Sequence, residues 1–130
     1  MRPEGIPLIV GGSADPALRR AGRHGLGINP LLAEQSVLRA KIAVWRSASE
    51  QAGHDPAKLD VVVRTNLLVG EDRSRREMAF GAWPLPELVD DLHVLEAIGV
   101  TEIFYELHDA TRPIEELVSE LAELKRRVGA

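Results

Sequence analysis

The chain has 130 residues, of which 45% are hydrophobic, and its formal net charge at pH 7 is −4. This length fits one domain spanning residues 1–130, and the negative charge argues against nucleic acid as a partner. Cysteine is absent, which excludes disulfides, thiolate catalysis and cysteine-ligated metal sites. No apolar run reaches the roughly 20 residues of a membrane span, and residues 1–5 lack the apolar core of a signal peptide, so we expect a cytoplasmic protein.

The first predicted unit is a strand, a glycine turn and a helix. Residues 6–10 form an apolar strand, residues 11–13 read Gly-Gly-Ser, and residues 14–24 form a helix. Asp15 and Pro16 suit the first turn of that helix. Glycines let a backbone approach a ligand closely, and the first free N–H groups of a helix point toward it. The turn therefore indicates a seat for an anion such as a phosphate.

The second predicted unit is shorter in its strand and longer in its helix. The strand occupies residues 27–30 and the helix residues 32–52, with Leu38, Ile42 and Trp45 on one face. Apolar residues at this spacing are typical of a helix that buries one side. We expect Trp45 to belong to the core.

Two further strand and helix units follow. The third strand, residues 59–66, contains a continuous apolar run that indicates burial on both faces. An arginine-rich stretch at residues 70–77 precedes a helix at 86–98. The fourth strand covers residues 102–107, and the last helix, at 113–128, carries its apolar residues in one stripe. Strands that alternate with helices predict an α/β fold with a parallel sheet and right-handed crossovers.

The first 28 residues also carry a distinctive pattern of matches to a known family. The matching residues are Pro7, Gly11, Gly12, Ala17, Leu18, Arg19, Arg20, Ala21, Arg23, Gly25 and Gly27. Together they resemble a run in the C-terminal half of the luciferase-like (bacterial luciferase superfamily) oxidoreductases, which use a flavin or a deazaflavin. The family run ends in Gly-Asp-Gly-Trp, where this chain has Leu26 and Ile28 in place of the Asp and the Trp. A weaker resemblance continues to the end of the chain.

The resemblance implies a TIM barrel, of which this chain would form the C-terminal half. A closed (β/α)8 barrel takes eight strands and roughly 250 residues, and four βα units are predicted here. Four parallel strands leave two sheet edges and an apolar inner face uncovered. We therefore expect a homodimer, or docking to a separate N-terminal half-barrel. A small open α/β sandwich and a truncated, partly stable product remain alternatives.

The candidate cofactor contacts lie where function collects in such barrels, at the carboxyl ends of the strands. They are Gly11, Gly12, Ser13, Asn29 and Arg64. The hydroxyl of Ser13 would bind a cofactor phosphate, or would instead cap the following helix. Asn29 would bond a ring or ribityl group, or would form an Asn-Pro turn. Arg64 would clamp a phosphate or the glutamyl tail of the deazaflavin, because a strand end disfavours an unpaired charge.

The fourth loop supplies the catalytic candidate, His108, which stands between the last strand and helix with Asp109 and Arg112. A histidine in this position would relay a proton or polarise a carbonyl. Adjacent strand residues point opposite ways, so the alternative is a helix-capping aspartate beside a surface histidine. No pair of histidines has a metal-binding spacing, and no metal site is expected.

The resemblance implies hydride transfer between a bound cofactor, FMN or the deazaflavin coenzyme F-420, and a small organic substrate. The expected partners are this cofactor and this substrate, without nucleic acid or membrane. In the family, the N-terminal half supplies much of the substrate pocket and the catalytic groups. The alternative is therefore a non-catalytic half-barrel for binding or dimerisation, or a truncated remnant of such an enzyme.

Overall fold

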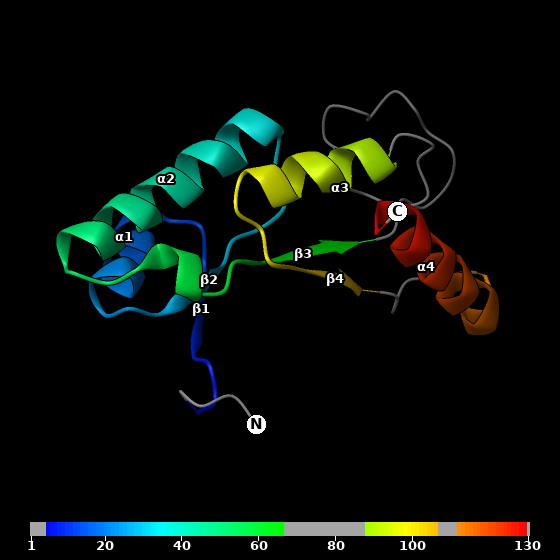
Figure 1. The fold of residues 1–130 in the computed structure, drawn as a ribbon, viewed down its shortest axis with the longest axis horizontal. Helices are drawn as coiled ribbons and strands as arrows, with labels where there is room; N and C mark the ends of the chain where they lie inside the picture. The colour runs from blue at the N-terminus through cyan, green and yellow to red at the C-terminus, as the bar shows by residue number, and fades with distance from the viewer. Residues whose placement is uncertain (1–4, 67–87, 107–111, 130) are drawn as a thin grey trace.

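The computed structural model of the chain describes residues 5–66, 88–106 and 112–129 (Figure 1). In chain order its elements are β1 (Ile9–Gly11), α1 (Asp15–Arg23), β2 (Gly27–Asn29), α2 (Gln35–Gln51), the 3-10 helix η1 (Pro56–Lys58), β3 (Val62–Asn66), α3 (Leu88–Ala97), β4 (Glu102–Glu106) and α4 (Ile114–Val128). The predicted alternation of strands and helices is confirmed within these ranges. The predicted loop at 70–77 lies outside the described residues.

The four strands run parallel. β1 pairs with β2, and β3 pairs with β4. Two isolated parallel bridges, Ile28 with Val61 and Leu31 with Arg64, connect the first pair to the second. The strands therefore lie in space in the order in which they occur in the sequence, as expected where each helix carries the chain to the neighbouring strand.

The start of α2 differs from the prediction because of this pairing. The sequence predicted a helix from residue 32, whereas α2 begins at Gln35. Leu31 bridges to Arg64, and the backbone N–H of Leu31 is bonded to Ser13. These bonds keep the chain extended beyond Pro30, so the helix cannot begin until the chain has left the sheet.

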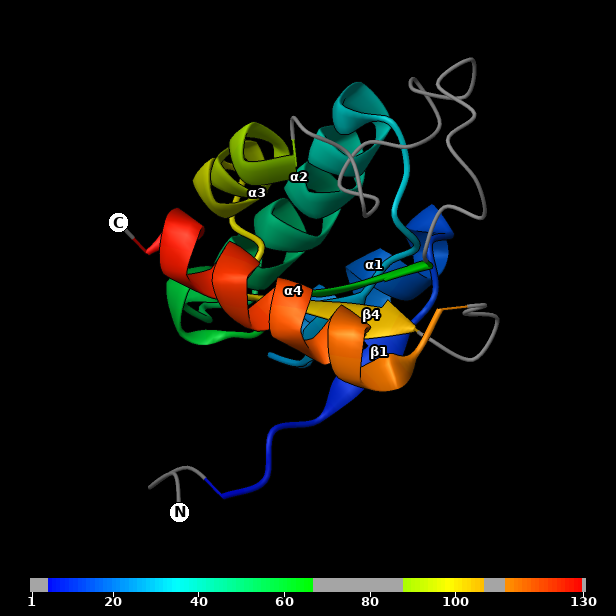
Figure 2. The same cartoon turned by 90° about the vertical axis from the view of Figure 1, so that its right-hand side faces the viewer.

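One face of the sheet is buried beneath helices. Figures 1 and 2 show α2 and α3 lying together over the same side of β3 and β4. The main core joins residues of β2, β3, these helices and the segments next to them with the inner side of α1. Its members are Leu18, Ala21, Ile28, Leu38, Ile42, Trp45, Val61, Val63, Leu95, Ile98 and Val100. The predicted inner face of α2 is confirmed, because Leu38, Ile42 and Trp45 are each at most 1% exposed.

A smaller apolar cluster attaches α4 to α3 and β4. Leu88 and Leu117 are buried there, with Tyr105 packed beside them. Burial raises the pKa of the Tyr105 phenol, and the nearby charge of Asp91 raises it further. The predicted apolar stripe of α4 is only partly buried, since Val118 remains more than half exposed.

The opposite face of the sheet is exposed in the structure. Ile9 is 40% exposed, Leu31 58% and Phe104 57%. In β3 the side chain of Val63 is buried while that of Arg64 is exposed. The expectation that the third strand is buried on both faces holds only in part: Val61 and Val63 are buried, whereas Val62 on the opposite face is half-buried, because the helices cover one side only. Side chains that alternate along a strand then alternate between core and surface.

Gly22 sets how closely α1 and α2 approach. A Cβ atom added at Gly22 would lie 2.5 Å from the carbonyl oxygen of Trp45 and 2.9 Å from the amide nitrogen of Ser49. Both are backbone atoms of α2, so neither can move aside without moving the helix. The two helices therefore meet at a position where only glycine fits.

We predict that Gly22→Ala destabilises the fold although alanine favours helices. The intrinsic gain is at most about 1 kcal/mol, whereas overpacking against backbone costs roughly 1–3 kcal/mol or more. Urea unfolding followed by circular dichroism measures the difference. Ser47→Ala, on the exposed side of α2, is the control and should stay within about 0.5 kcal/mol of the parent. A Gly22→Ala protein more stable than the parent would contradict the close approach.

Candidate functional site

The turn between β1 and α1 is open on its outer side. Gly12 has φ 140°, a conformation that residues with a side chain rarely adopt. A Cβ added at Gly11 would meet no atom within 4 Å, and one added at Gly12 would meet only the Cβ of Ala17, at 4.0 Å. The glycines therefore leave space beside the backbone rather than filling a packed corner.

The amides of this turn divide into bonded and available groups. The Gly12 N–H donates to the carbonyl oxygen of Asn29 at 3.2 Å, so it belongs to the sheet. The N–H groups of Ser13 and Ala14 have no acceptor among the residues that the structure describes. Both stand at the N-terminus of α1, where the helix dipole favours negative charge. Two donors are thus available to an anion at this position.

Ser13 links two loops instead of capping the helix. The N-cap of α1 is Ala14, and no side chain caps this helix. The Ser13 Oγ instead accepts a hydrogen bond from the backbone N–H of Leu31 at 3.0 Å. The capping alternative is therefore wrong. The Ser13 hydroxyl keeps its own proton for donation, because a hydroxyl both accepts and donates.

Asn29 fastens β2 to β3. Its Nδ2 donates to the carbonyl oxygen of Val62 at 2.8 Å, in a partly buried position. This bond orients the carboxamide at the carboxyl end of β2, whose last residue is Asn29 itself. The side chain thus has a structural partner in the neighbouring strand, which the sequence did not predict.

Arg64 has a charged partner. Its Nε lies 3.5 Å from Glu106 Oε2, and the two side chains are 49% and 28% exposed. The strand register explains why Glu106 is within reach. Arg64 lies opposite Phe104, and Glu106 is two residues farther along β4, opposite Asn66. Arg64 is therefore not the unpaired charge that the sequence suggested at this strand end. Such surface pairs contribute little to stability, so the guanidinium stays accessible to a further anion.

Several of these predicted positions lie close together at the carboxyl ends of neighbouring strands. The Ser13–Leu31 hydrogen bond and the Leu31–Arg64 bridge place the glycine turn, the end of β2 and Arg64 along three neighbouring strands. Two strand spacings separate Ser13 from Arg64, about 9.5 Å. The catalytic candidate His108 lies outside the described residues, as do Asp109 and the arginine-rich loop.

A carboxylate stands close to the available amides but is already paired. Asp15 Oδ1 lies 2.8 Å from Lys41 Nζ of α2. The hydrogen bond and charge of Lys41 hold the pKa of Asp15 below its ordinary value, and Arg19 adds a smaller lowering effect. The lysine therefore offsets the one negative side chain in the first turn of α1.

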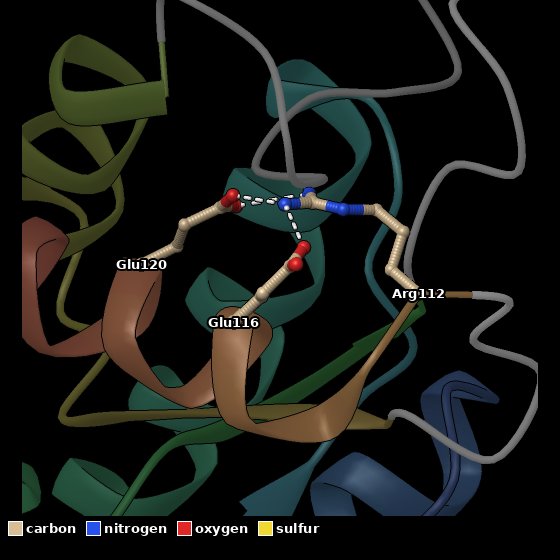
Figure 3. Close-up of polar contacts among 3 residues, drawn as sticks. All are labelled: Arg112, Glu116 and Glu120. Atoms are coloured by element: carbon tan, nitrogen blue, oxygen red, sulfur yellow. Dashed lines mark hydrogen bonds and ion pairs between the residues drawn. The ribbon is translucent and has the colours of Figure 1, made fainter.

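Arg112 forms a network that the sequence analysis did not identify (Figure 3). Its Nη1 donates to Glu120 Oε2 at 3.2 Å, its Nη2 donates to Glu116 Oε2 at 3.4 Å, and Nη2 also bonds the other oxygen of Glu120. These bonds raise the pKa of Arg112, with Glu120 the largest cause. The signal was present in the sequence, because acidic residues four and eight positions later share one helix face. Arg112 is therefore bonded to side chains of α4.

The part of the chain that the structure describes contains neither a cluster of metal ligands nor a membrane-spanning helix. No group of three or more histidine, aspartate or glutamate side chains there is arranged to hold a metal ion. No helix within the same ranges is long and apolar enough to cross a membrane.

The parallel α/β fold and the helix N-terminus beside a glycine turn agree with the family to which the sequence compares. The family model described as luciferase-like monooxygenase matches residues 1–126. The chain therefore belongs to the luciferase-like monooxygenase family, and the resemblance drawn from its first 28 residues is confirmed. No curated protein sequence matches it.

One solved structure agrees with this chain in fold over nearly its whole length. Monooxygenase RslO1 from Streptomyces bottropensis has a TM-score of 0.67 at 15% identity, over 93% of this chain and 46% of that one. The chain thus spans about half the length of RslO1. An F420-dependent secondary alcohol dehydrogenase in complex with an F420-acetone adduct has a TM-score of 0.46 at 19% identity, over 94% of this chain and 40% of that one. The oxygenating constituent of 3,6-diketocamphane monooxygenase from Pseudomonas putida, in complex with FMN, has a TM-score of 0.40 at 15% identity, over 95% and 40%.

We predict that Lys41→Gln raises the pKa of Asp15 toward its ordinary value of 3.8. Because the folded-state pKa is lowered, the pair stabilises the fold above about pH 4 and loses this contribution as the pH falls through the lowered pKa. A carbon-13 NMR titration of the carboxyl groups measures the shift. Lys58→Gln, a lysine of η1, is the control and should leave Asp15 unchanged. An Asp15 pKa equal in parent and Lys41→Gln proteins would refute the assignment.

Proposed function

We propose that this chain is the phosphate-binding module of a luciferase-like oxidoreductase, with FMN or coenzyme F-420 as its cofactor. The observation that carries the proposal is the pair of available N–H groups at Ser13 and Ala14, beside glycines that leave open space. Backbone donors at a helix N-terminus suit a phosphate. Membership of the luciferase-like family supports an oxidoreductase, and the resemblance implies these two cofactors.

The other residues of the edge fit the same ligand. The Ser13 hydroxyl retains a proton to donate, and Lys41 holds the Asp15 carboxylate. Asn29 would contribute the part of its carboxamide that is not bonded to Val62. Arg64 would contribute guanidinium N–H groups other than the Nε that faces Glu106. A second anionic group of the cofactor would reach Arg64 if it lay about two strand spacings from the phosphate.

The division of labour follows from these positions. The bound cofactor would supply hydride transfer with a small organic substrate. The residues of this chain would hold the phosphate and so fix the cofactor against the carboxyl edge of the sheet. His108 stays the predicted proton-transfer candidate, and a cytoplasmic location likewise stays a prediction.

We predict saturable quenching when FMN or coenzyme F-420 fluorescence is titrated with the protein. Gly12→Asp should weaken binding by about tenfold or more, because it places a carboxylate beside the amides and like charges repel. Gly12→Asn is the matched control: it imposes the same backbone strain at φ 140° and nearly the same volume, without the charge. Its affinity should stay several-fold above that of Gly12→Asp. Equal affinities of the parent and Gly12→Asp would remove the turn from the binding site.

The uncovered sheet face favours a second, structural function. The apolar side chains of Ile9, Leu31 and Phe104 are exposed on it. Exposed apolar groups gathered on one face mark an interaction surface. We propose that the strands form the C-terminal half of a barrel and that this face is covered in solution by a second copy of the chain. Docking to a separate N-terminal half-barrel is the other arrangement that would cover it.

We predict a solution mass near twice the 14.2 kDa of one chain, measured by light scattering after size exclusion. Phe104→Lys should shift the mass toward the monomer, because a charge cannot be buried there without a partner. Val37→Lys, which replaces an exposed apolar side chain of α2, is the control and should leave the mass unchanged. A parent protein that is monomeric and fully folded at high concentration would contradict the second copy.

A further inference from the structure

A groove of about 490 Å³ runs along the contact between α1 and α2. Arg19 and Arg23 of α1 line one wall, and Ser47 and Gln51 of α2 line the other, above an apolar floor that includes Val44. Within each pair the two residues are four positions apart, so their side chains lie one above the other on the helix surface. The volume falls in the range of small-molecule sites.

The polar groups of the groove are mainly donors. The guanidinium groups of Arg19 and Arg23 can only donate. Gln51 Nε2 donates to Ser47 Oγ at 3.1 Å, which leaves the one hydroxyl proton of Ser47 for another acceptor. No carboxylate lines the groove. A ligand rich in acceptor oxygens therefore complements it.

The charge of Arg19 acts weakly on Asp15, whose pKa it helps to lower. Within the described ranges, no carboxylate forms an ion pair with Arg19 or Arg23. The nearest acid of α1, Asp15, is bonded to Lys41. This local positive charge stands in a chain of net charge −4. Arg23 suits the last turn of α1 through the helix dipole, but Arg19 lies in mid-helix and gains nothing from it.

The walls of the groove are held at a set distance. Gly22 lies between Arg19 and Arg23 in the helical repeat, and a Cβ there would come within 2.5 Å of the Trp45 carbonyl. The two helix backbones are therefore in close contact beside the groove. Side chains carried by such a rigid pair of helices are better preorganised than those of a loop.

We propose that this groove binds a phosphate monoester or a small polyphosphate, at a site separate from the cofactor seat. Two guanidinium groups on one wall match the charge and the several oxygens of a phosphate better than the single charge of a carboxylate. On α1 the seat at Ala14 is five residues from Arg19 and nine from Arg23, about 7.5 Å and 13.5 Å at the helical rise. One phosphate cannot occupy both.

Nitrogen-15 NMR with inorganic pyrophosphate at constant ionic strength tests the proposal on the full chain. We expect saturable shifts of amides in α1 and α2 around the groove. The double variant Arg19→Gln/Arg23→Gln should weaken this binding by about tenfold or more. Arg20→Gln is the matched control, because Arg20 is an arginine of the same helix that does not line the groove. It should change the affinity by less than about twofold.

The outcomes separate this site from the cofactor seat. Gly12→Asp should leave the groove shifts in place while removing any shifts at residues 13–15. Shifts confined to residues 13–15, or groove shifts equally reduced by Arg20→Gln and by the double variant, would overturn the proposal. So would shifts that never saturate or that equimolar chloride reproduces, since these report only a general charge effect. Circular dichroism of each variant checks that the exposed substitutions leave the fold intact.

Discussion

Trp45 holds the N-terminal part of the structure together. Its indole is 1% exposed and its Nε1 donates to the carbonyl oxygen of Leu26 at 2.9 Å, immediately before β2. Its own carbonyl faces Gly22 of α1 at a distance that admits no side chain. One residue thus positions α2 against both α1 and the strand that follows it. The start of α1, where the available amides stand, depends on this arrangement.

Hydrogen bonds across the sheet then bring the candidate site into register. Ser13 is bonded to Leu31, Leu31 bridges to Arg64, and Arg64 faces Glu106. Each contact connects one strand or loop to the next. The carboxyl ends of the strands are therefore linked by polar contacts, while the apolar core lies on the other face of the sheet. The candidate site residues therefore lie at the carboxyl ends of the strands, apart from the apolar core beneath the helices.

Local chemistry made several features predictable. The glycine turn was recognisable because only glycine readily adopts a φ near 140°, and the apolar spacing of α2 identified Leu38, Ile42 and Trp45 as core. Ser13 was ambiguous, because a serine before a helix caps it unless another donor competes, and here the N–H of Leu31 does. The partner of Arg64 was not predictable, since Glu106 reaches it through strand register across 42 positions of sequence. The acidic partners of Arg112 were missed although their spacing follows the helical repeat.

The sequence by itself determined the alternation of strands and helices, the position of the glycine turn and the family, because each rests on residue type and near-neighbour spacing. Only the tertiary structure decided which amides of the turn stay available, which face of β3 is covered and which charge meets Arg64. Those outcomes depend on contacts between segments far apart in the chain, and hydrophobic patterning constrains such contacts without specifying the individual pairs. The groove between α1 and α2 is another feature that only the tertiary structure decided, because its two walls come from different helices that Gly22 allows to meet.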